Sequence, residues 1–319
     1  MTAIDPAPQA CCCYTVNEGY LLPTLLSASQ LRRSLPRGAA DVAVVCFGPA
    51  TDVTAAGAEF CAQVEIRFIL VPTAHLDGAP MICARFFLSA ILEPRYRDIV
   101  YLDGDTQVSG SLEPLLVHAV EPGQVLAAPD PMAVMIDSPR APWPARRAYF
   151  ERLGMPTHRH GQYFNSGVLR FLRDDWEGLS HDCLKLCAAR GSAFEFRDQD
   201  ALNIVVGNHH RPISFRWNFP PFFMNFGADA AIAPRVYHFM SNPRPWQGAF
   251  PPWGRAWHEP YVAFLANNPV FAGSMQRVGR LHAVKYAAQQ RFKRHMEARQ
   301  WGVPAVRQRI ADMEARAVV

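Results

Sequence analysis

Apolar and polar positions along the first part of the chain fall into two kinds of segment. Short apolar runs of strand-forming residues cover 10–16, 41–47 and 64–71, and such runs are typical of buried strands. Between the first two runs, residues 21–35 carry Leu22, Leu25 and Leu31 at helical spacing, with Pro23 tolerated near the helix start. Strands that alternate with helices predict an α/β fold with a mainly parallel sheet.

The same alternation continues beyond residue 80. We expect a helix over 81–92, strands over 99–102 and 123–129, and then a Pro- and Arg-rich stretch over 131–161 that holds one short helix near 144–153. A strand over 163–171, helices over 179–190 and after 198, and a short strand over 236–239 complete the pattern.

The strand over 99–102 runs directly into Asp103, Gly104 and Asp105. Residues i and i+2 of extended backbone point to the same face, so the two carboxylates form a hard oxygen site for a divalent cation. Gly104 leaves room for a ligand to approach the backbone, and ligands bind at the carboxyl ends of strands in such sheets. Asp-Gly-Asp is also ordinary turn chemistry, so at this point both interpretations stay open.

Composition bounds the class of protein. Half of the 319 residues are apolar and 19% are charged, which fits one large globular domain or two. A net charge of +4 does not indicate a nucleic-acid partner. No secretory leader and no apolar stretch of membrane-spanning length is visible in the sequence. The eight cysteines show no metal-ligand spacing, and the adjacent Cys11, Cys12 and Cys13 are expected to be small buried side chains in a reducing cytoplasm.

The basic character is concentrated near the C-terminus. Residues 273–319 hold ten Lys or Arg and three Asp or Glu, a net charge of +7, so the rest of the chain carries −3. Apolar residues follow helical spacing there at Leu281, Val284, Ala288 and Phe292. The basic residues interleaved with them are Arg277, Arg280, Lys285, Arg291, Lys293 and Arg294. A basic amphipathic helix is typical of a contact with an anionic membrane surface, and a solvated helix packed on the rest of the chain is the alternative.

Four segments, taken together and in order, resemble glycosyltransferase family 8. This family comprises retaining nucleotide-sugar transferases and includes bacterial lipopolysaccharide galactosyl- and glucosyltransferases and glycogenin. The segments are Tyr101-Leu102-Asp103-Gly104-Asp105, Phe164-Asn165-Ser166-Gly167-Val168-Leu169, Asp198-Gln199-Asp200-Ala201-Leu202-Asn203, and His238 through Pro245-Trp246. Arg85, within Cys83-Ala84-Arg85-Phe86, matches a basic position of the family before the metal motif. The similarity extends from about residue 11 to residue 246.

The resemblance implies a GT-A type fold, with a catalytic domain over 1–260 and a helical basic extension over 261–319. It implies that Asp103, Asp105 and His238 hold Mn²⁺ or Mg²⁺ against the donor diphosphate, and an imidazole ligand favours Mn²⁺. Residues implied to bind the donor are Asn17, Arg85, Asp103, Gly104, Asp105, Asn165, Ser166, Ser241 and Arg244. The family usually has Gly and Lys where this chain has Ser241 and Arg244.

The resemblance further implies a retaining hexosyltransferase that moves galactose or glucose from a UDP-sugar to a sugar hydroxyl, in lipopolysaccharide or other cell-surface glycan synthesis. Gln199 matches the position where a double displacement would need a carboxylate nucleophile. We therefore expect same-face attack, with Asp130, Asp198 and Gln199 as the catalytic residues that orient the sugar and stabilise positive charge.

The acceptor is expected to be a saccharide. If the C-terminal helix contacts the inner face of the membrane, we expect this saccharide to be linked to a lipid. Trp217, Phe219, Phe222 and Phe223 are either an aromatic acceptor wall or a packed core loop. Two other functions stay open: a catalytically inactive nucleotide-sugar-binding protein, and a sugar nucleotidyltransferase. The latter would need a Gly-rich phosphate loop after the first strand, which the segment Asn17-Glu18-Gly19-Tyr20 does not provide.

Overall fold

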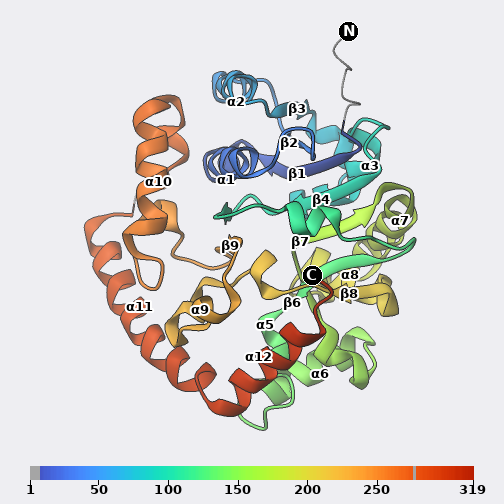
Figure 1. Cartoon of the computed structure of the whole chain (residues 1–319), viewed down its shortest axis with the longest axis vertical. Coiled ribbons are helices and arrows are strands. Elements are labelled where there is room, and N and C mark those ends of the chain that lie inside the picture. Colours follow the sequence, from blue (N-terminus) through green and yellow to red (C-terminus); the bar gives the residue numbers. More distant parts are fainter. Residues whose placement is uncertain (1–7, 276–277) are drawn as a thin grey trace.

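A seven-stranded sheet with the order β3-β2-β1-β4-β7-β6-β8 forms the centre of the computed structural model, which describes residues 8–275 and 278–319 (Figure 1). Its strands are β1 (Ala10–Asn17), β2 (Asp41–Phe47), β3 (Arg67–Val71), β4 (Asp98–Leu102), β6 (Val125–Pro129), β7 (Phe164–Leu172) and β8 (His210–Pro212). Neighbouring strands are parallel except at β7, which is antiparallel to both β4 and β6. The prediction of a mainly parallel α/β sheet is confirmed.

Helices cover both faces of this sheet (Figure 1). They are α1 (Leu21–Ser34), α2 (Asp52–Gln63), α3 (Leu88–Ile91), α4 (Glu113–Val117), α5 (Pro131–Met135), α6 (Trp143–Leu153), α7 (Arg173–Arg190), α8 (Arg197–Val205), α9 (Ala228–Ile232), α10 (Gly254–Asn267), α11 (Arg280–Trp301) and α12 (Pro304–Arg316). A separate pair, β5 (Thr106–Val108) and β9 (Val236–His238), forms a small antiparallel sheet.

Three helical segments differ from the sequence prediction. The segment expected as one helix over 81–92 is a 3-10 helix, η3 (Met81–Phe87), followed by the short α3. The helix expected from residue 179 begins at Arg173. The stretch over 131–161 contains α5 as well as α6, because the Asp130 side chain accepts a hydrogen bond from the Met132 N–H and Pro131 suits a first turn.

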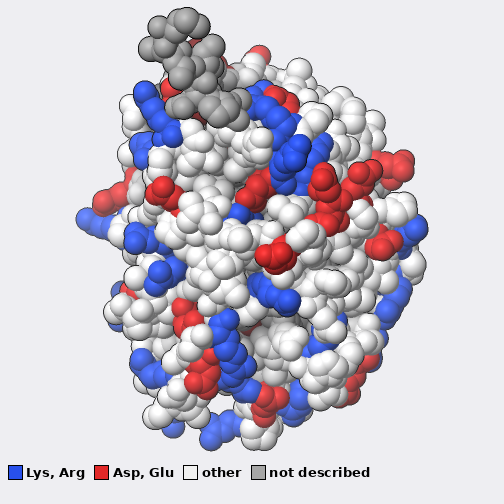
Figure 2. Space-filling view, turned by 45° about the vertical axis from the view of Figure 1, so that its right-hand side comes forward, with Lys and Arg blue, Asp and Glu red and all other residues white. Residues whose placement is uncertain are grey.

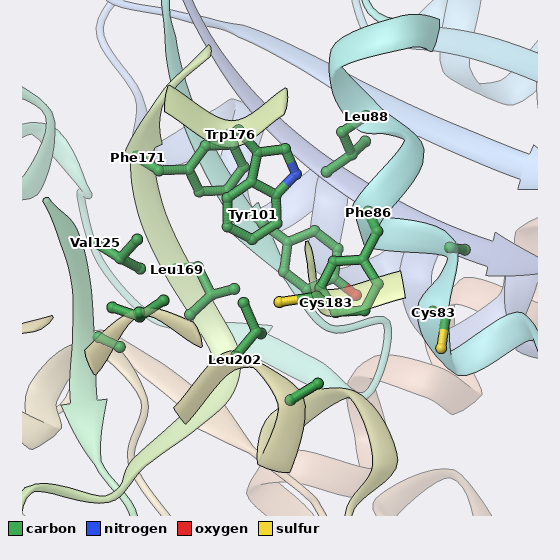
Figure 3. Packing of buried hydrophobic residues seen from close by; sticks show 14 of the residues in the cluster. Cys83, Phe86, Leu88, Tyr101, Val125, Leu169, Phe171, Trp176, Cys183 and Leu202 are labelled. Carbon is green, nitrogen blue, oxygen red and sulfur yellow. The ribbon is translucent and has the colours of Figure 1, made fainter. Parts of the chain in front are cut away.

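The consecutive cysteines of β1 show how the two faces of the sheet are filled. Cys11 and Cys13 belong to the core cluster beneath α7 and α8, whereas Cys12 belongs to the cluster beneath α1. All three are fully buried, as expected for alternating side chains of a central strand. On the first face, Trp176 of α7 stacks on Phe171 of β7 (Figure 3), and the ring centroids lie 3.8 Å apart.

The C-terminal helices pack on the body of the protein. Trp301, Val306 and Ile310 are buried in a third core cluster, which also contains aromatic residues of the segment 215–253. The Ser214 hydroxyl donates to Glu314 at 2.6 Å, and the Val318 N–H donates to the Pro212 carbonyl. Figure 1 shows α10, α11 and α12 following one another around the edge of the molecule. The division into 1–260 and 261–319 stays a prediction; in the structure residue 260 lies inside α10.

Helix α11 presents two different faces. Its inner face packs Tyr286 and Ala287 against the third core cluster. Leu281, Val284 and Phe292, three of the apolar positions noted in the sequence, are 87%, 70% and 68% exposed. Among the described residues, no helix is long and apolar enough to cross a membrane. Figure 2 shows basic and acidic side chains interspersed on one face of the molecule. Arg277 lies outside the described residues.

Candidate active site

Two sheets bring the expected metal ligands together. Asp103 and Asp105 follow the last residue of β4, and β5 begins immediately afterwards. Because β5 pairs with β9, Thr106 lies opposite His238. One ligand atom from each of Asp103, Asp105 and His238 lies within 4.8 Å of the others. The three residues that the sequence suggested as metal ligands are therefore neighbours in space.

A chain of amides orients the imidazole of His238. The Gly167 N–H, which can only donate, bonds to Asn165 Oδ1, and Asn218 Nδ2 donates to the same oxygen at 2.8 Å. Asn218 Oδ1 therefore faces His238 Nδ1 at 2.9 Å, so Nδ1 carries a proton. His238 Nε2 lies 3.1 Å from an Asp105 oxygen. Burial would lower the pKa of His238, but the Asp105 carboxylate raises it overall. Nε2 and the carboxylate oxygens are also donor atoms that a divalent cation can share.

Glycines at two positions permit this packing. A Cβ at Gly167 would lie 2.2 Å from Cε1 of His238, so any larger residue would displace the imidazole. A Cβ at Gly104 would lie 2.4 Å from Oγ1 of Thr24 in α1. Gly104 is therefore required for close packing of the Asp-Gly-Asp segment on α1, and the approach of a ligand to its backbone stays a prediction.

Two arginines neutralise the carboxylates of the metal site. Arg244 Nη1 donates to Asp105 Oδ2 at 2.5 Å, and Arg85 Nη2 contacts Asp103 Oδ1 at 2.9 Å and Asp198 Oδ2 at 3.1 Å. Burial would raise the pKa of Asp105, but His238 and Arg244 hold it well below its usual range. Asp105 is therefore an anion at neutral pH, and Arg244 places a positive charge beside it. The donor set fits a hard divalent cation.

A cavity of about 650 Å³ opens beside this cluster. The residues suggested by the sequence that line it are Asn17, Arg85, Asp103, Gly104, Asp105, Asp130, Asn165, Ser166, Asp198, Gln199 and His238. Ser241 instead lines a neighbouring cavity of about 50 Å³, which shares Phe222 and Met240 with the large one. The main contact of Arg244 is its ion pair with Asp105.

The other end of the cavity is built around Gln199 near the start of α8. Gln199 Oε1 accepts from the Ser166 N–H at 3.0 Å, and its Nε2 donates to Asp130 Oδ2 at 3.1 Å. Ser166 lies near the metal site because β7 is antiparallel to β4, with Val168 opposite Leu102. Burial raises the pKa of Asp130 above its ordinary value.

The aromatic loop is mainly core. Trp217, Phe219 and Phe223 are fully buried, so of the two alternatives for this loop the packed core is the one that holds for these three. Phe222 alone of the four lines the cavity. Phe196, which precedes α8 and is 38% exposed, also lines it.

Sequence reasoning missed two residues that contact metal-site side chains. Asn218, already described, follows Trp217 in an aromatic segment where nothing marked it as functional. The Tyr101 hydroxyl donates to Asp103 Oδ1 at 2.7 Å, and the guanidinium of Arg85 lies 4.4 Å from the centroid of the Tyr101 ring. Tyr101 lies two residues before Asp103 in the β4 segment, and this shared strand face was the available signal.

Comparison with known proteins identifies the family. Residues 11–249 match the sequence profile described as Glycosyl transferase family 8. The chain belongs to glycosyltransferase family 8. A search of curated proteins gives no match.

Solved glycosyltransferases share the fold of this family 8 chain. The structure of the galactosyltransferase LgtC with donor and acceptor sugar analogs is similar with a TM-score of 0.62 at 21% identity, covering 86% of this chain and 99% of LgtC. The bifunctional glycosyltransferase WbbM matches with a TM-score of 0.65 at 18% identity, covering 87% of this chain and 52% of WbbM. GlyE of Streptococcus pneumoniae TIGR4 matches with a TM-score of 0.56 at 16% identity, covering 85% of this chain and 66% of GlyE. The GT-A type fold is thereby confirmed.

Proposed function

We propose that this family 8 glycosyltransferase moves a hexose, galactose or glucose, from a UDP-sugar to a sugar hydroxyl. The observation that carries the proposal is the convergence of Asp103, Asp105 and His238 at the edge of the large cavity. These residues would hold Mn²⁺ or Mg²⁺, and such an ion screens a diphosphate and stabilises charge on the leaving group. Arg244, close to Asp105, adds a guanidinium suited to phosphate oxygens.

The residues expected to bind the donor divide between its parts. We assign Asn17, at the end of β1, to the base and ribose. We assign Arg244, which is paired with Asp105, and Ser241, which lines the neighbouring small cavity, to the diphosphate. The hexose would lie against the side chains around Gln199, which are Asp130, Asn165, Ser166, Asp198 and Gln199 itself, and against Arg85, which bridges Asp103 and Asp198. Gly104 keeps the metal-binding segment close to α1, because a Cβ at this position would clash with Thr24.

Retention is what the family resemblance implies, and the sugar end bears on how it would be achieved. Gln199 is an amide and a poor nucleophile, so we propose same-face attack by the acceptor hydroxyl, with the leaving phosphate taking its proton. Asp130, Asp198 and Gln199 would orient the hexose and stabilise the positive charge that develops on its ring. Phe196 and Phe222, both on the cavity wall, supply apolar surface for the acceptor sugar.

The outer face of α11 supports a lipid-linked acceptor in cell-surface glycan synthesis, such as that of lipopolysaccharide, at the cytoplasmic face of a membrane. Leu281, Val284 and Phe292 project from this helix, which carries six Lys or Arg and one Glu between residues 280 and 301. Exposed apolar side chains on a basic helix suit the surface of an anionic bilayer.

The activity is tested with purified protein, UDP-galactose or UDP-glucose, and Mn²⁺. We expect the metal and one of the two donors together to raise the melting temperature, because both bind only the assembled site, and we expect slow release of UDP without acceptor. EDTA should remove both effects. Equal stabilisation in EDTA would contradict the metal assignment. If the protein bound a UDP-sugar but released no UDP with any acceptor, it would be an inactive binding protein. If it released pyrophosphate from a nucleoside triphosphate and a sugar phosphate, it would be a nucleotidyltransferase.

Membrane contact is tested by substitution rather than truncation, because removal of the tail would also remove Trp301 and other core side chains. We expect the triple change Leu281→Ser, Val284→Ser and Phe292→Ser to release the protein from anionic liposomes at low salt while UDP affinity is unchanged. Val117→Ser, at a 75% exposed valine in α4, is the matched control and should bind liposomes as the wild type does. Wild-type protein that ignores anionic liposomes would refute the contact.

A further inference from the structure

A buried carboxylate lies behind the sugar end of the cavity. Asp200 is fully buried and accepts hydrogen bonds from the Tyr163 hydroxyl at 2.6 Å, from the Tyr149 hydroxyl, and from the Phe196 N–H at 2.9 Å. The lining of the large cavity, as far as the structure describes it, includes neither the two tyrosines nor Asp200. The proposed function gives these three side chains no role.

The hydrogen-bond donors in this cluster can be assigned one by one. Tyr163 gives its only hydroxyl proton to Asp200, so its oxygen can only accept, and it accepts from Gln199 Nε2 at 3.3 Å. The Asp130 carboxylate accepts from the same nitrogen. On the other side of the amide, the Ser166 N–H can only donate, and it bonds to Oε1. Three partners with fixed roles therefore select one of the two orientations of the Gln199 amide.

We propose that Tyr163 and Asp200 are positioning residues that hold the Gln199 amide with its oxygen available to the donor sugar. The inference rests on the proposed function and adds the means by which Gln199 is oriented. Both protons on Nε2 are occupied, by Asp130 and by Tyr163. The second lone pair of the Gln199 carbonyl oxygen is reached only by the Ser166 hydroxyl, at 3.5 Å, and this hydroxyl can donate instead to Asp198 Oδ2 at 3.3 Å. A donor sugar can therefore take this lone pair. A fixed carbonyl dipole stabilises positive charge on the sugar in the transition state, whereas an inverted amide would oppose it.

Tyr149 provides a matched comparison within the same cluster. Its hydroxyl accepts from the Glu195 N–H at 2.8 Å and donates to Asp200, as the Tyr163 hydroxyl does, but it does not bond to Gln199. Both rings also pack on Phe150, with centroids 4.6 Å away for Tyr163 and 5.9 Å away for Tyr149. Tyr→Phe at either position keeps the ring and removes one hydrogen bond to Asp200. Each variant also loses the hydrogen bond that its oxygen accepts, which comes from Gln199 in the case of Tyr163 and from the Glu195 N–H in the case of Tyr149.

The first experiment compares turnover with affinity in Tyr163→Phe and Tyr149→Phe. With Mn²⁺ and the better of UDP-galactose and UDP-glucose, we expect Tyr163→Phe to lower turnover about tenfold with an unchanged dissociation constant for UDP. Tyr149→Phe should change turnover less than twofold. In a Gln199→Leu background, Tyr163→Phe should cause no further loss, because Tyr163 acts through Gln199. Equal losses in the two tyrosine variants, or an additive loss with Gln199→Leu, would overturn the proposal.

A second experiment tests the positioning role without measuring turnover. The protein is labelled with ¹⁵N-glutamine, and the side-chain amide signals are recorded by NMR. The signal that is missing from the spectrum of Gln199→Leu belongs to Gln199. We expect both protons of this amide to exchange slowly with solvent in the wild type and in Tyr149→Phe, and one of them to exchange fast in Tyr163→Phe. An unchanged Gln199 signal in Tyr163→Phe would refute the positioning role even in an active enzyme. If the wild type turned over neither donor, the proposed function would fail, while the amide signal would still confirm or refute the orientation.

Discussion

Two parts of the large cavity, the proposed metal end around Asp105 and the proposed sugar end around Gln199, are held together by different physical means. At the metal end, Asp105 is paired with Arg244 and His238, and Asp103 is paired with Arg85, so charges fix the geometry. At the sugar end, Gln199 is fixed by hydrogen bonds to Ser166, Asp130 and Tyr163.

The consequence is that the metal end should respond most strongly to changes of charge, and the sugar end to changes in hydrogen-bond direction. A charged cluster of this kind binds a cation in the ground state as well as in the transition state. A directed amide acts mainly on charge that appears during the reaction. The expected effects below test this division in order of decreasing size.

The largest effect is expected for Asp105→Asn. The substitution keeps the shape of the side chain but removes one negative charge from the cation's ligands. Affinity for Mn²⁺ and for UDP should both fall by roughly 100-fold, and turnover should fall with them. Isothermal titration with Mn²⁺, and then with UDP in saturating Mn²⁺, measures this. If Asp105→Asn bound Mn²⁺ as tightly as the wild type does, Asp105 would not be a metal ligand.

The next effect concerns the sugar end. Gln199→Ala should lower turnover by about 100-fold and leave UDP affinity unchanged, because the lost dipole acts on charge that develops on the sugar. Initial rates and UDP titration on the same preparation separate the two quantities. If Gln199→Ala weakened UDP binding as much as Asp105→Asn does, the division between the two ends would be wrong. A covalent sugar adduct on residue 199 of Gln199→Glu would place this residue on the attack face.

A smaller effect is expected where the two ends meet. Asn218→Leu removes the acceptor that fixes His238 Nδ1, and loss of such an outer partner lowers metal affinity by about 10- to 100-fold. Titration of Mn²⁺ into the variant measures this. Asn225→Leu removes a comparable amide that bonds to Glu297 and should bind Mn²⁺ as the wild type does. Equal weakening in both variants would indicate general destabilisation.

The last effect concerns stability rather than activity, and it is a pH dependence at β8. Burial lowers the pKa of His210 to about 4; this imidazole bonds to the Ala127 carbonyl and stacks on Phe164. In the unfolded chain the imidazole binds a proton near pH 6.5, so stability falls as the pH drops from 6.5 towards 4, by roughly 2–3 kcal/mol. Chemical denaturation at several pH values should show a shallower slope for His210→Gln than for the exposed control His209→Gln. Equal slopes would contradict this.

Much of the fold could be predicted from the sequence because burial along a single element follows its local periodicity. The strand period placed Cys11, Cys12 and Cys13 correctly, and all three are buried on alternate faces of the sheet. Asp103 and Asp105 could be found because residues i and i+2 of an extended strand point to the same face, so the sequence alone places the two carboxylates together. His238 needed the family motif, since no local pattern connects it with Asp103.

Local periodicity could not decide which of two neighbouring apolar surfaces packs against the rest of the protein. In α11 the stripe through Leu281 and Phe292 has helical spacing, yet the neighbouring stripe through Tyr286 is the one packed on the body. In the aromatic loop, Phe222 lines the cavity while Phe223 is buried, although the two are adjacent and chemically identical.

The sequence by itself determined the alternation of strands and helices, the carboxylate pair and the basic C-terminal helix, because each depends on residues close together in the chain. The tertiary structure alone decided the antiparallel direction of β7, which brings Ser166 beside Asp103, and the amide chain through Asn218 to His238. It also placed Tyr163 and Asp200 behind Gln199. The orientation of an amide or an imidazole depends on partners supplied by other elements, and the chain order of residues does not specify which of these partners meet.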